Sequence, residues 1–240
     1  ASPSARQRNV TGAFTGGSGD VKDVEVSWDG TRLLFAMRAP EIEDADPEDQ
    51  PTWNIWEYDI TAKVLRRIMV SDITAEDGQD VAPHYLPDGR IIFSSTRQRR
   101  SRAILVDEGK EQFSALDEDR NEPALVLHVM DADGSNITQV TYNQSHDLDP
   151  TVLDSGEVAF VRWENMGSRN ALSLYRMQPD GTGLELFYGA HSHATGTDGA
   201  EVHFLQPRER ADGLLLAVKL PLSGSYRGGE LVLIDTENYI

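Results

Sequence analysis

The feature that most constrains this chain is an internal repeat of short strands. An apolar strand, a tight turn with glycine and a second apolar strand recur four times, at residues 24–36, 83–95, 150–162 and 202–219. A third strand with alternating apolar and polar residues follows each copy, at 54–60, 125–131, 172–178 and 230–236. Such alternation is typical of half-buried strands, and the sequence lacks a long segment with the 3.6-residue spacing of a helix. The repeat therefore predicts an all-β chain.

The turns predict how these strands are connected. Asp-Gly pairs favour tight antiparallel hairpins, and a fourth strand follows in three copies, at 64–70, 136–142 and 184–190. Four antiparallel strands in a repeating unit form one blade of a β-propeller. We expect a single domain over 1–240 with blades at about 20–70, 71–142, 143–190 and 191–240, the last blade lacking its fourth strand. A β-sandwich is the alternative, although a sandwich gives no reason for internal repetition.

Several segments resemble the TolB-type (WD40-like) propeller repeat. They are Ser27–Phe35, Leu86–Phe93, Met130–Asn136 and Met177–Gly183. The resemblance implies a propeller, but it leaves function open because that repeat serves both partner-binding proteins and hydrolases. Residues 107–136 and 143–165 are also similar to the propeller of exported bacterial proteins related to the hydrazine synthase alpha subunit. The haem-attaching Cys-x-x-Cys-His motifs of that subunit are absent from this sequence.

The number of blades in the closed ring stays open at the sequence level. TolB-like propellers commonly have six blades, so the resemblance implies that these four belong to a larger ring. One alternative is that the segment Val10–Phe14 donates the missing outer strand and closes a four-bladed ring. Another chain completing the ring is the third possibility.

Composition limits the partners. The chain has 22 Lys and Arg against 40 Asp and Glu, a net charge of −18 that disfavours nucleic acid and anionic membrane surfaces. Its apolar runs are far shorter than the ~20 residues that span a bilayer. With no cysteine, it forms neither a thiolate metal site nor a covalent haem attachment. We expect an exported, periplasmic protein, and the start at Ala1 suggests a processed form or a fragment.

Loop lengths predict which face is functional. In an up-and-down blade the connections alternate between two faces, and tight turns such as SWDGT and LPDGR all belong to one of them. The long connections belong to the other, including 38–52 and 98–123 within blades and 72–82, 143–149 and 189–200 between blades. Binding residues concentrate on long loops of a rigid scaffold, so we expect the functional face there.

Histidine and aspartate in the connections between blades are the candidate metal ligands. They are Asp80, His146, Asp147, Asp149, His191 and His193. Imidazole and carboxylate together bind Zn²⁺ or a similar divalent metal, or act as acid and base on a polar ligand. The competing interpretation is that these side chains cap turns and bond neighbouring blades. We expect Asp80 and Asp147 at equivalent points around the channel mouth, because each precedes an aligned proline by three residues.

Other conspicuous groups have structural interpretations. We expect a solvated loop for the acidic run 41–49, local salt bridges for the arginines of 97–102, and packing between blades for all four tryptophans. Residues 103–120 are compatible with either a short helix or an irregular loop. The sequence contains no recognisable catalytic nucleophile motif.

Two hypotheses of function follow. The first is a non-catalytic propeller scaffold that binds a partner protein or a further domain of the same polypeptide through its long-loop face, with no activity from this chain alone. The second is the propeller of a larger exported enzyme, hydrazine-synthase-like and haem-containing, to which the His and Asp loops contribute a metal or cofactor pocket at the channel mouth. The cofactor itself is not predicted.

Overall fold

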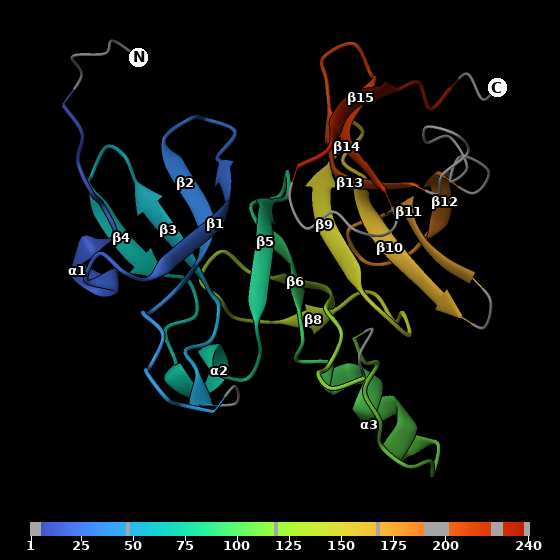
Figure 1. Ribbon diagram of the computed structural model, residues 1–240, viewed down its shortest axis with the longest axis horizontal. Helices are drawn as coiled ribbons and strands as arrows, with labels where there is room; N and C mark the ends of the chain where they lie inside the picture. The colour runs from blue at the N-terminus through green and yellow to red at the C-terminus, as the bar shows by residue number, and fades with distance from the viewer. Residues whose placement is uncertain are drawn as a thin grey trace.

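Four antiparallel sheets form an arc of propeller blades (Figure 1). The computed structural model describes residues 6–46, 49–117, 120–166, 169–189, 202–221 and 228–237. Blades 1 to 3 have four strands each, and the described part of blade 4 has three. The all-β fold and the four blades that the repeat predicts are thereby confirmed.

The strands of each blade follow one another in space as they do in sequence. Blade 1 contains β1 (Asp20–Val26), β2 (Arg32–Arg38), β3 (Asn54–Asp59) and β4 (Val64–Arg67). Blade 2 contains β5 (Asp80–Tyr85), β6 (Ile91–Ser95), β7 (Val126–Met130) and β8 (Thr138–Gln139). Blade 3 contains β9 (Asp147–Val152), β10 (Val158–Met166), β11 (Arg169–Met177) and β12 (Glu185–Tyr188). Blade 4 contains β13 (Val202–Glu209), β14 (Leu215–Pro221) and β15 (Glu230–Ile234).

The first strand of every blade carries a β-bulge. The bulged residue has a left-handed backbone, with φ between 48° and 55°, at Asp23, Ala82, Asp149 and Gln206. A bulge bends its strand and interrupts the two-residue alternation of faces. Strands β5 and β9 therefore begin three residues before the prolines at which the apolar pattern predicts them.

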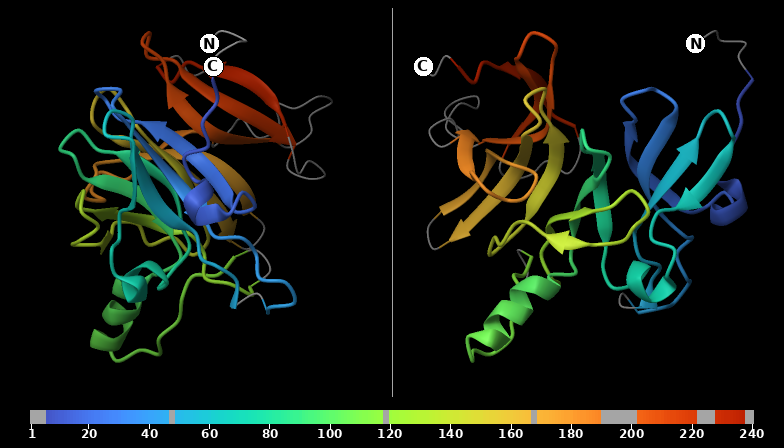
Figure 2. Two further views of the ribbon diagram at one scale, coloured as in Figure 1. Left: turned by 90° about the vertical axis from the view of Figure 1, so that its left-hand side faces the viewer. Right: turned by 180° about the vertical axis from the view of Figure 1, so that it is seen from behind.

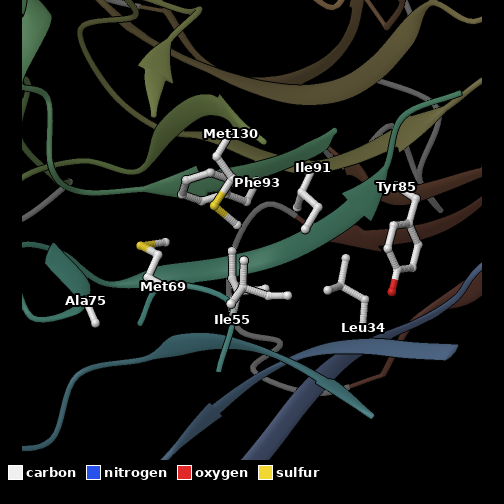
Figure 3. Packing of buried hydrophobic residues seen from close by; sticks show 9 residues of the cluster. Leu34, Ile55, Met69, Ala75, Tyr85, Ile91, Phe93 and Met130 are labelled. Atoms are coloured by element: carbon white, nitrogen blue, oxygen red, sulfur yellow. The ribbon is translucent and has the colours of Figure 1, made fainter. Parts of the chain in front are cut away.

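The blades are held together by apolar cores between neighbouring sheets. Blades 1 and 2 enclose Leu34, Ile55 and Phe93, which Figure 3 shows from close by. Phe160 lies in the core between blades 2 and 3, and Phe204 in the core between blades 3 and 4. Each core is built from adjacent repeats, which is why one repeat is not stable alone.

Glycines in the turns between third and fourth strands allow neighbouring blades to approach. A Cβ on Gly181 would lie 2.3 Å from the carbonyl oxygen of Val140 in blade 2, and one on Gly134 would lie 2.6 Å from that of Ile68 in blade 1. Both glycines also have positive φ, 87° and 83°. The repeated Asp-Gly turn is therefore an inter-blade contact as well as a hairpin.

The two ends of the arc are apolar faces. Leu231 of blade 4 is 72% exposed, whereas Leu127 and Leu174, at the same repeat position in blades 2 and 3, are fully buried against the following blade. On the other end, Val26 of β1 is 54% exposed, and the equivalent Tyr85 of blade 2 is 6% exposed. The described residues form no core between blades 4 and 1, which stand apart in both views of the arc (Figures 1 and 2).

The segment Val10–Phe14 does not donate a strand to blade 4, so that alternative is wrong. It leads into α1 (Gly12–Thr15), and it packs on blade 1 instead. The Phe14 ring lies 4.4 Å from that of Trp56. The segment lies there because Val10 and Phe14 make apolar contacts with the face of blade 1 that no other described blade covers.

Two helices lie on the long-loop face. They are α2 (Asp72–Ala75), between blades 1 and 2, and α3 (Arg99–Asp107), within blade 2; both are at the lower end of Figure 1. The ambiguous stretch 103–120 thus contains the end of a helix followed by irregular chain. None of the described helices is long and apolar enough to span a membrane.

Candidate functional site on the long-loop face

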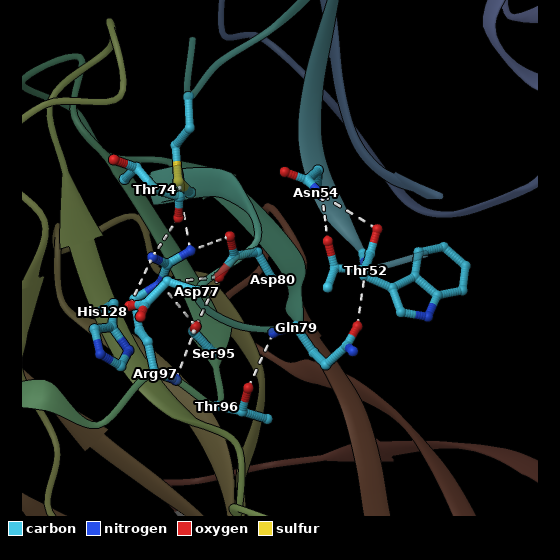
Figure 4. A network of polar contacts seen from close by, with 12 residues as sticks. Thr52, Asn54, Thr74, Asp77, Gln79, Asp80, Ser95, Thr96, Arg97 and His128 are labelled. Carbon is cyan, nitrogen blue, oxygen red and sulfur yellow. Dashed lines mark hydrogen bonds and ion pairs between the residues drawn. The ribbon is translucent and has the colours of Figure 1, made fainter. Parts of the chain in front are cut away.

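Asp80 begins the first strand of blade 2 and is bound to an arginine. Its carboxylate pairs with Arg97 at 2.5 Å and accepts a 2.6 Å hydrogen bond from the Ser95 hydroxyl (Figure 4). The side chain is fully buried, and burial raises the pKa of Asp80 to about 6 against the opposing effect of Arg97. Both carboxylate oxygens are engaged in this network.

The same pair recurs in the neighbouring blades. Asp147 binds Arg162 through two hydrogen bonds of 2.8 and 2.9 Å, and Asp20 of blade 1 pairs with Arg38 at 2.6 Å. Asp80 and Asp147 therefore occupy equivalent positions, as their spacing to proline predicts. In each pair an aspartate at the beginning of the first strand meets an arginine in the second strand or just after it. Asp20 lies three residues before its bulged residue, whereas Asp80 and Asp147 lie two residues before theirs.

Asp149 bonds one blade to the next. It is the bulged residue of β9, and its Oδ2 accepts the backbone N–H of Gln206, the bulged residue of β13, at 3.1 Å. Asp23 makes the same bond to the N–H of Ala82 at 2.9 Å. Burial raises the pKa of Asp149, and the nearby Asp23 carboxylate adds to this.

His146 lies in the connection between blades 2 and 3. Its Nδ1 accepts the backbone N–H of Leu125 at 3.0 Å, and its ring stacks on that of Trp163 at 5.7 Å. Since Nδ1 is an acceptor, the neutral ring carries its proton on Nε2.

The predicted metal ligands are thus distributed among several structural contacts. Among the described residues, no three His, Asp or Glu side chains are grouped closely enough to hold a metal ion. His191 and His193 lie outside the described residues, so a metal site that includes them stays a prediction. Asp80 and Asp147 instead form ion pairs with Arg97 and Arg162.

Sequence reasoning expected a local salt bridge for Arg97 but missed its pairing with Asp80, and it missed the roles of Arg38 and Arg162. The signal was present, since an arginine follows each aspartate after 18, 17 and 15 residues in blades 1, 2 and 3. The bulge and the variable turn lengths hide this spacing from a search for exact repeats. Trp28 is also different from expectation: it is 66% exposed at a tight turn and does not pack between blades.

A cavity of about 430 Å³, which we call the channel-mouth pocket, opens among the long loops of blades 1 to 3. Trp53 forms one wall, and the Lys22 ammonium and the Arg38 guanidinium lie 4.4 and 5.1 Å from its ring centre. His146 lines it as well, and two acidic residues of the blade 2 insertion, Asp117 and Glu122, lie in its lining.

A second, larger hollow of about 850 Å³ lies beside α3, and we call it the α3 groove. Its exposed apolar residues are Ile104 on α3, Phe113 and Leu116 on the returning chain, and Tyr142 between blades 2 and 3. Phe113 is 65% exposed. A cluster of exposed large side chains around a hollow is typical of a protein-binding surface.

A buried glutamine holds the α3 groove in shape. The Gln98 side chain accepts the N–H of Ala115 and donates to the carbonyl oxygens of Ala115 and Ala124, at 2.7 to 3.1 Å. These bonds join Gln98, where the insertion begins, to Ala115 within it and to Ala124 at its end. The bridge between Leu116 and Pro123 lies next to them. The described part of the insertion is therefore held in a defined position on blade 2 by these hydrogen bonds.

The fold is that of a β-propeller whose long loops gather on one face. Among solved structures the chain is similar to hydrazine synthase of Kuenenia stuttgartiensis, with a TM-score of 0.62 and 18% identity over 87% of this chain and 30% of that one. An oligogalacturonate lyase solved with manganese matches at 0.50 and 15% identity, over 85% and 48% of the two chains. A TolB-type protein of Agrobacterium tumefaciens aligns at only 0.43 and 18% identity, over 72% and 67%.

These similarities show the propeller fold and not the activity. The chain spans less than a third of the hydrazine synthase chain and about half of the lyase chain. No protein-family model matches the sequence, and no curated protein is significantly similar to it.

Proposed function

We propose that this chain is a propeller scaffold that binds a partner protein, or a further domain of its own polypeptide, through the α3 groove on its long-loop face. The observation that supports this is the exposed apolar set Ile104, Phe113, Leu116 and Tyr142 around one hollow. Burying such side chains contributes roughly 1.5–3 kcal/mol each, which suits an apolar segment of a protein.

The charge of the chain agrees with a protein partner rather than a nucleic acid. A net charge of −18 repels phosphate backbones, and among the described residues the groove is lined by apolar and uncharged polar side chains together with one acid and one arginine. The partner segment we propose is therefore apolar and close to neutral.

A photo-crosslinking amino acid at Leu116 tests this proposal in the complete protein, in its own host. We expect one defined crosslinked product, with a higher mass for a separate partner and an internal link for a domain of the same polypeptide. Phe113→Asp should remove that product. Ile60→Asp, which alters an exposed apolar residue on the tight-turn face, should leave it unchanged. Equal products from all three proteins would reject the groove as the docking site.

The proposed scaffold extends beyond four blades. Leu231 and Val26 are exposed at positions where the repeat buries its side chains against a following or a preceding blade. Further blades covering both ends make the four described ones part of a larger ring. We also propose that the protein is periplasmic or otherwise exported, which the repeat resemblance supports; cell fractionation tests this.

A second candidate function is a metal or cofactor pocket within a larger enzyme. It is favoured by the position of His146 in the lining of the channel-mouth pocket. Elemental analysis of the purified protein, compared with the double variant His191→Ala and His193→Ala, tests it. A stoichiometric metal lost in that variant supports this function, and the absence of any stoichiometric metal rejects the metal pocket.

A further inference from the structure

The channel-mouth pocket presents hydrogen-bond donors at one end. Lys22 of β1 contributes an ammonium group that has no ion pair among the described residues and lies over the face of the Trp53 ring. The Gln79 side chain uses its oxygen to accept the N–H of Trp53 at 2.9 Å, which leaves its amino group as a donor at the pocket wall.

The indole wall is held in place by the backbone. Trp53 accepts the Asp80 N–H through its carbonyl oxygen at 2.9 Å, in addition to the bond from its own N–H to Gln79. The Gln79 N–H in turn donates to the Thr96 hydroxyl at 2.9 Å (Figure 4). A flat aromatic surface fixed in this way is a platform for a ring or a chain of CH groups.

Two acidic side chains also line the pocket. Asp117 and Glu122 belong to the blade 2 insertion, and the Asp117 carboxylate caps its turn by accepting the N–H groups of Asn121 and Glu122 at 2.8 and 3.2 Å. These acids repel a second negative charge on a ligand. Arg38 is already neutralised by Asp20 and Glu41, so the Lys22 ammonium is the cation left to pair with an anion.

From this arrangement we infer that the channel-mouth pocket binds a small organic monocarboxylate, with its carboxylate toward Lys22 and Gln79 and its ring or hydrocarbon body against Trp53. The cavity of about 430 Å³ accommodates a ring of six atoms with a substituent. This inference does not depend on docking at the α3 groove, because the two hollows are distinct and share only Asp117 in their linings.

Binding of benzoate to the chain tests the inference, measured by titration calorimetry and saturation-transfer NMR. We expect benzoate to bind at least about tenfold more tightly than benzyl alcohol or benzylamine, because a hydrogen bond to a charged group contributes roughly 1.5–3 kcal/mol. Terephthalate, whose second carboxylate would face Asp117 and Glu122, should bind more weakly than benzoate. Cyclohexanecarboxylate distinguishes an aromatic from a saturated ring as the preferred body.

Variants separate the pocket from the rest of the surface. Lys22→Met should weaken benzoate binding by about tenfold, and Lys22→Arg should restore most of it. Lys63→Met, on the tight-turn face, is the matched control and should not change it. Trp53→Leu should also weaken binding, with far-UV circular dichroism confirming the fold. The inference is overturned by undetectable benzoate binding, by equal binding of benzyl alcohol or terephthalate, or by an unchanged affinity in Lys22→Met.

Discussion

At the residue scale, buried charges in this propeller are paired across a blade. Asp80 is fully buried with Arg97, whose side chain is 4% exposed, whereas Asp20 of the equivalent pair in blade 1 is 52% exposed. The same motif thus exists in a buried and in a solvated form. The difference arises because blade 2 has neighbours on both sides and blade 1 on one.

This contrast predicts unequal costs for equivalent substitutions. Asp80→Ala should lower the free energy of unfolding by about 3–5 kcal/mol, because it removes the closest partner of the buried Arg97 guanidinium and leaves the longer ion pair with Asp77 at 3.5 Å. Asp20→Ala, the matched substitution in a solvated pair, should cost less than about 1 kcal/mol. Urea unfolding of the two variants measures the difference, and similar losses in both would contradict the assignment. Asp80→Ala combined with Arg97→Met should recover part of the loss.

His128 makes stability depend on pH. Burial lowers the pKa of His128 to about 4, and the ring contacts Phe93 and bonds to the Val126 carbonyl oxygen at 3.0 Å. The unfolded chain binds this proton near pH 6.5, so the stability from a neutral buried ring is complete above that pH and is lost as pH falls toward 4. From pH 7 to 5 the loss should be about 2 kcal/mol.

Urea unfolding at pH 7 and pH 5 checks this dependence. His128→Phe removes the titrating ring and should reduce the loss between the two pH values by about 2 kcal/mol relative to the parent protein. An identical loss in both proteins would show that other groups cause the acid sensitivity.

At the scale of elements, the turn between third and fourth strands has a contact role that is separate from its local conformation. Gly181 has a φ of 87° and lies against the backbone of blade 2, whereas Gly156 has a φ of 85° and nothing within 4 Å of an added Cβ. The two glycines therefore share a left-handed backbone conformation and differ in their surroundings.

Alanine substitutions should separate these two effects. Gly156→Ala should cost about 1–2 kcal/mol, which is the penalty of an L-residue in a left-handed conformation. Gly181→Ala should cost at least about 2 kcal/mol more, because its Cβ would approach the Val140 carbonyl oxygen and push blades 2 and 3 apart. Thermal and urea unfolding provide both values. Equal losses would mean that the turn moves away without cost.

At the scale of the whole molecule, the inner faces of the arc are buried between neighbouring blades, whereas the two end faces are exposed. Leu174 of blade 3 and Leu231 of blade 4 occupy the same repeat position, at 0% and 72% exposure. The Leu231 side chain is therefore apolar at a repeat position where no following blade covers it among the described residues.

Truncation at the two positions tests this directly. Leu174→Ala should destabilise the chain by about 2–5 kcal/mol through a buried cavity, and Leu231→Ala should change its stability by less than about 0.5 kcal/mol. Sedimentation analysis should accompany the unfolding curves, because an exposed apolar end also favours self-association. A large loss in Leu231→Ala without self-association would show that this face is already covered.

The sequence alone determined the strand order, the blade repeat and the division into a tight-turn and a long-loop face, since these depend on local alternation, turn residues and loop lengths. Only the tertiary structure decided what the candidate site residues do. The Asp80 and Asp147 carboxylates meet arginines from the end of the next strand, and Asp149 meets a backbone N–H 57 residues away. Such partners come together only when bulges set the register and neighbouring blades pack, so no local pattern specifies them.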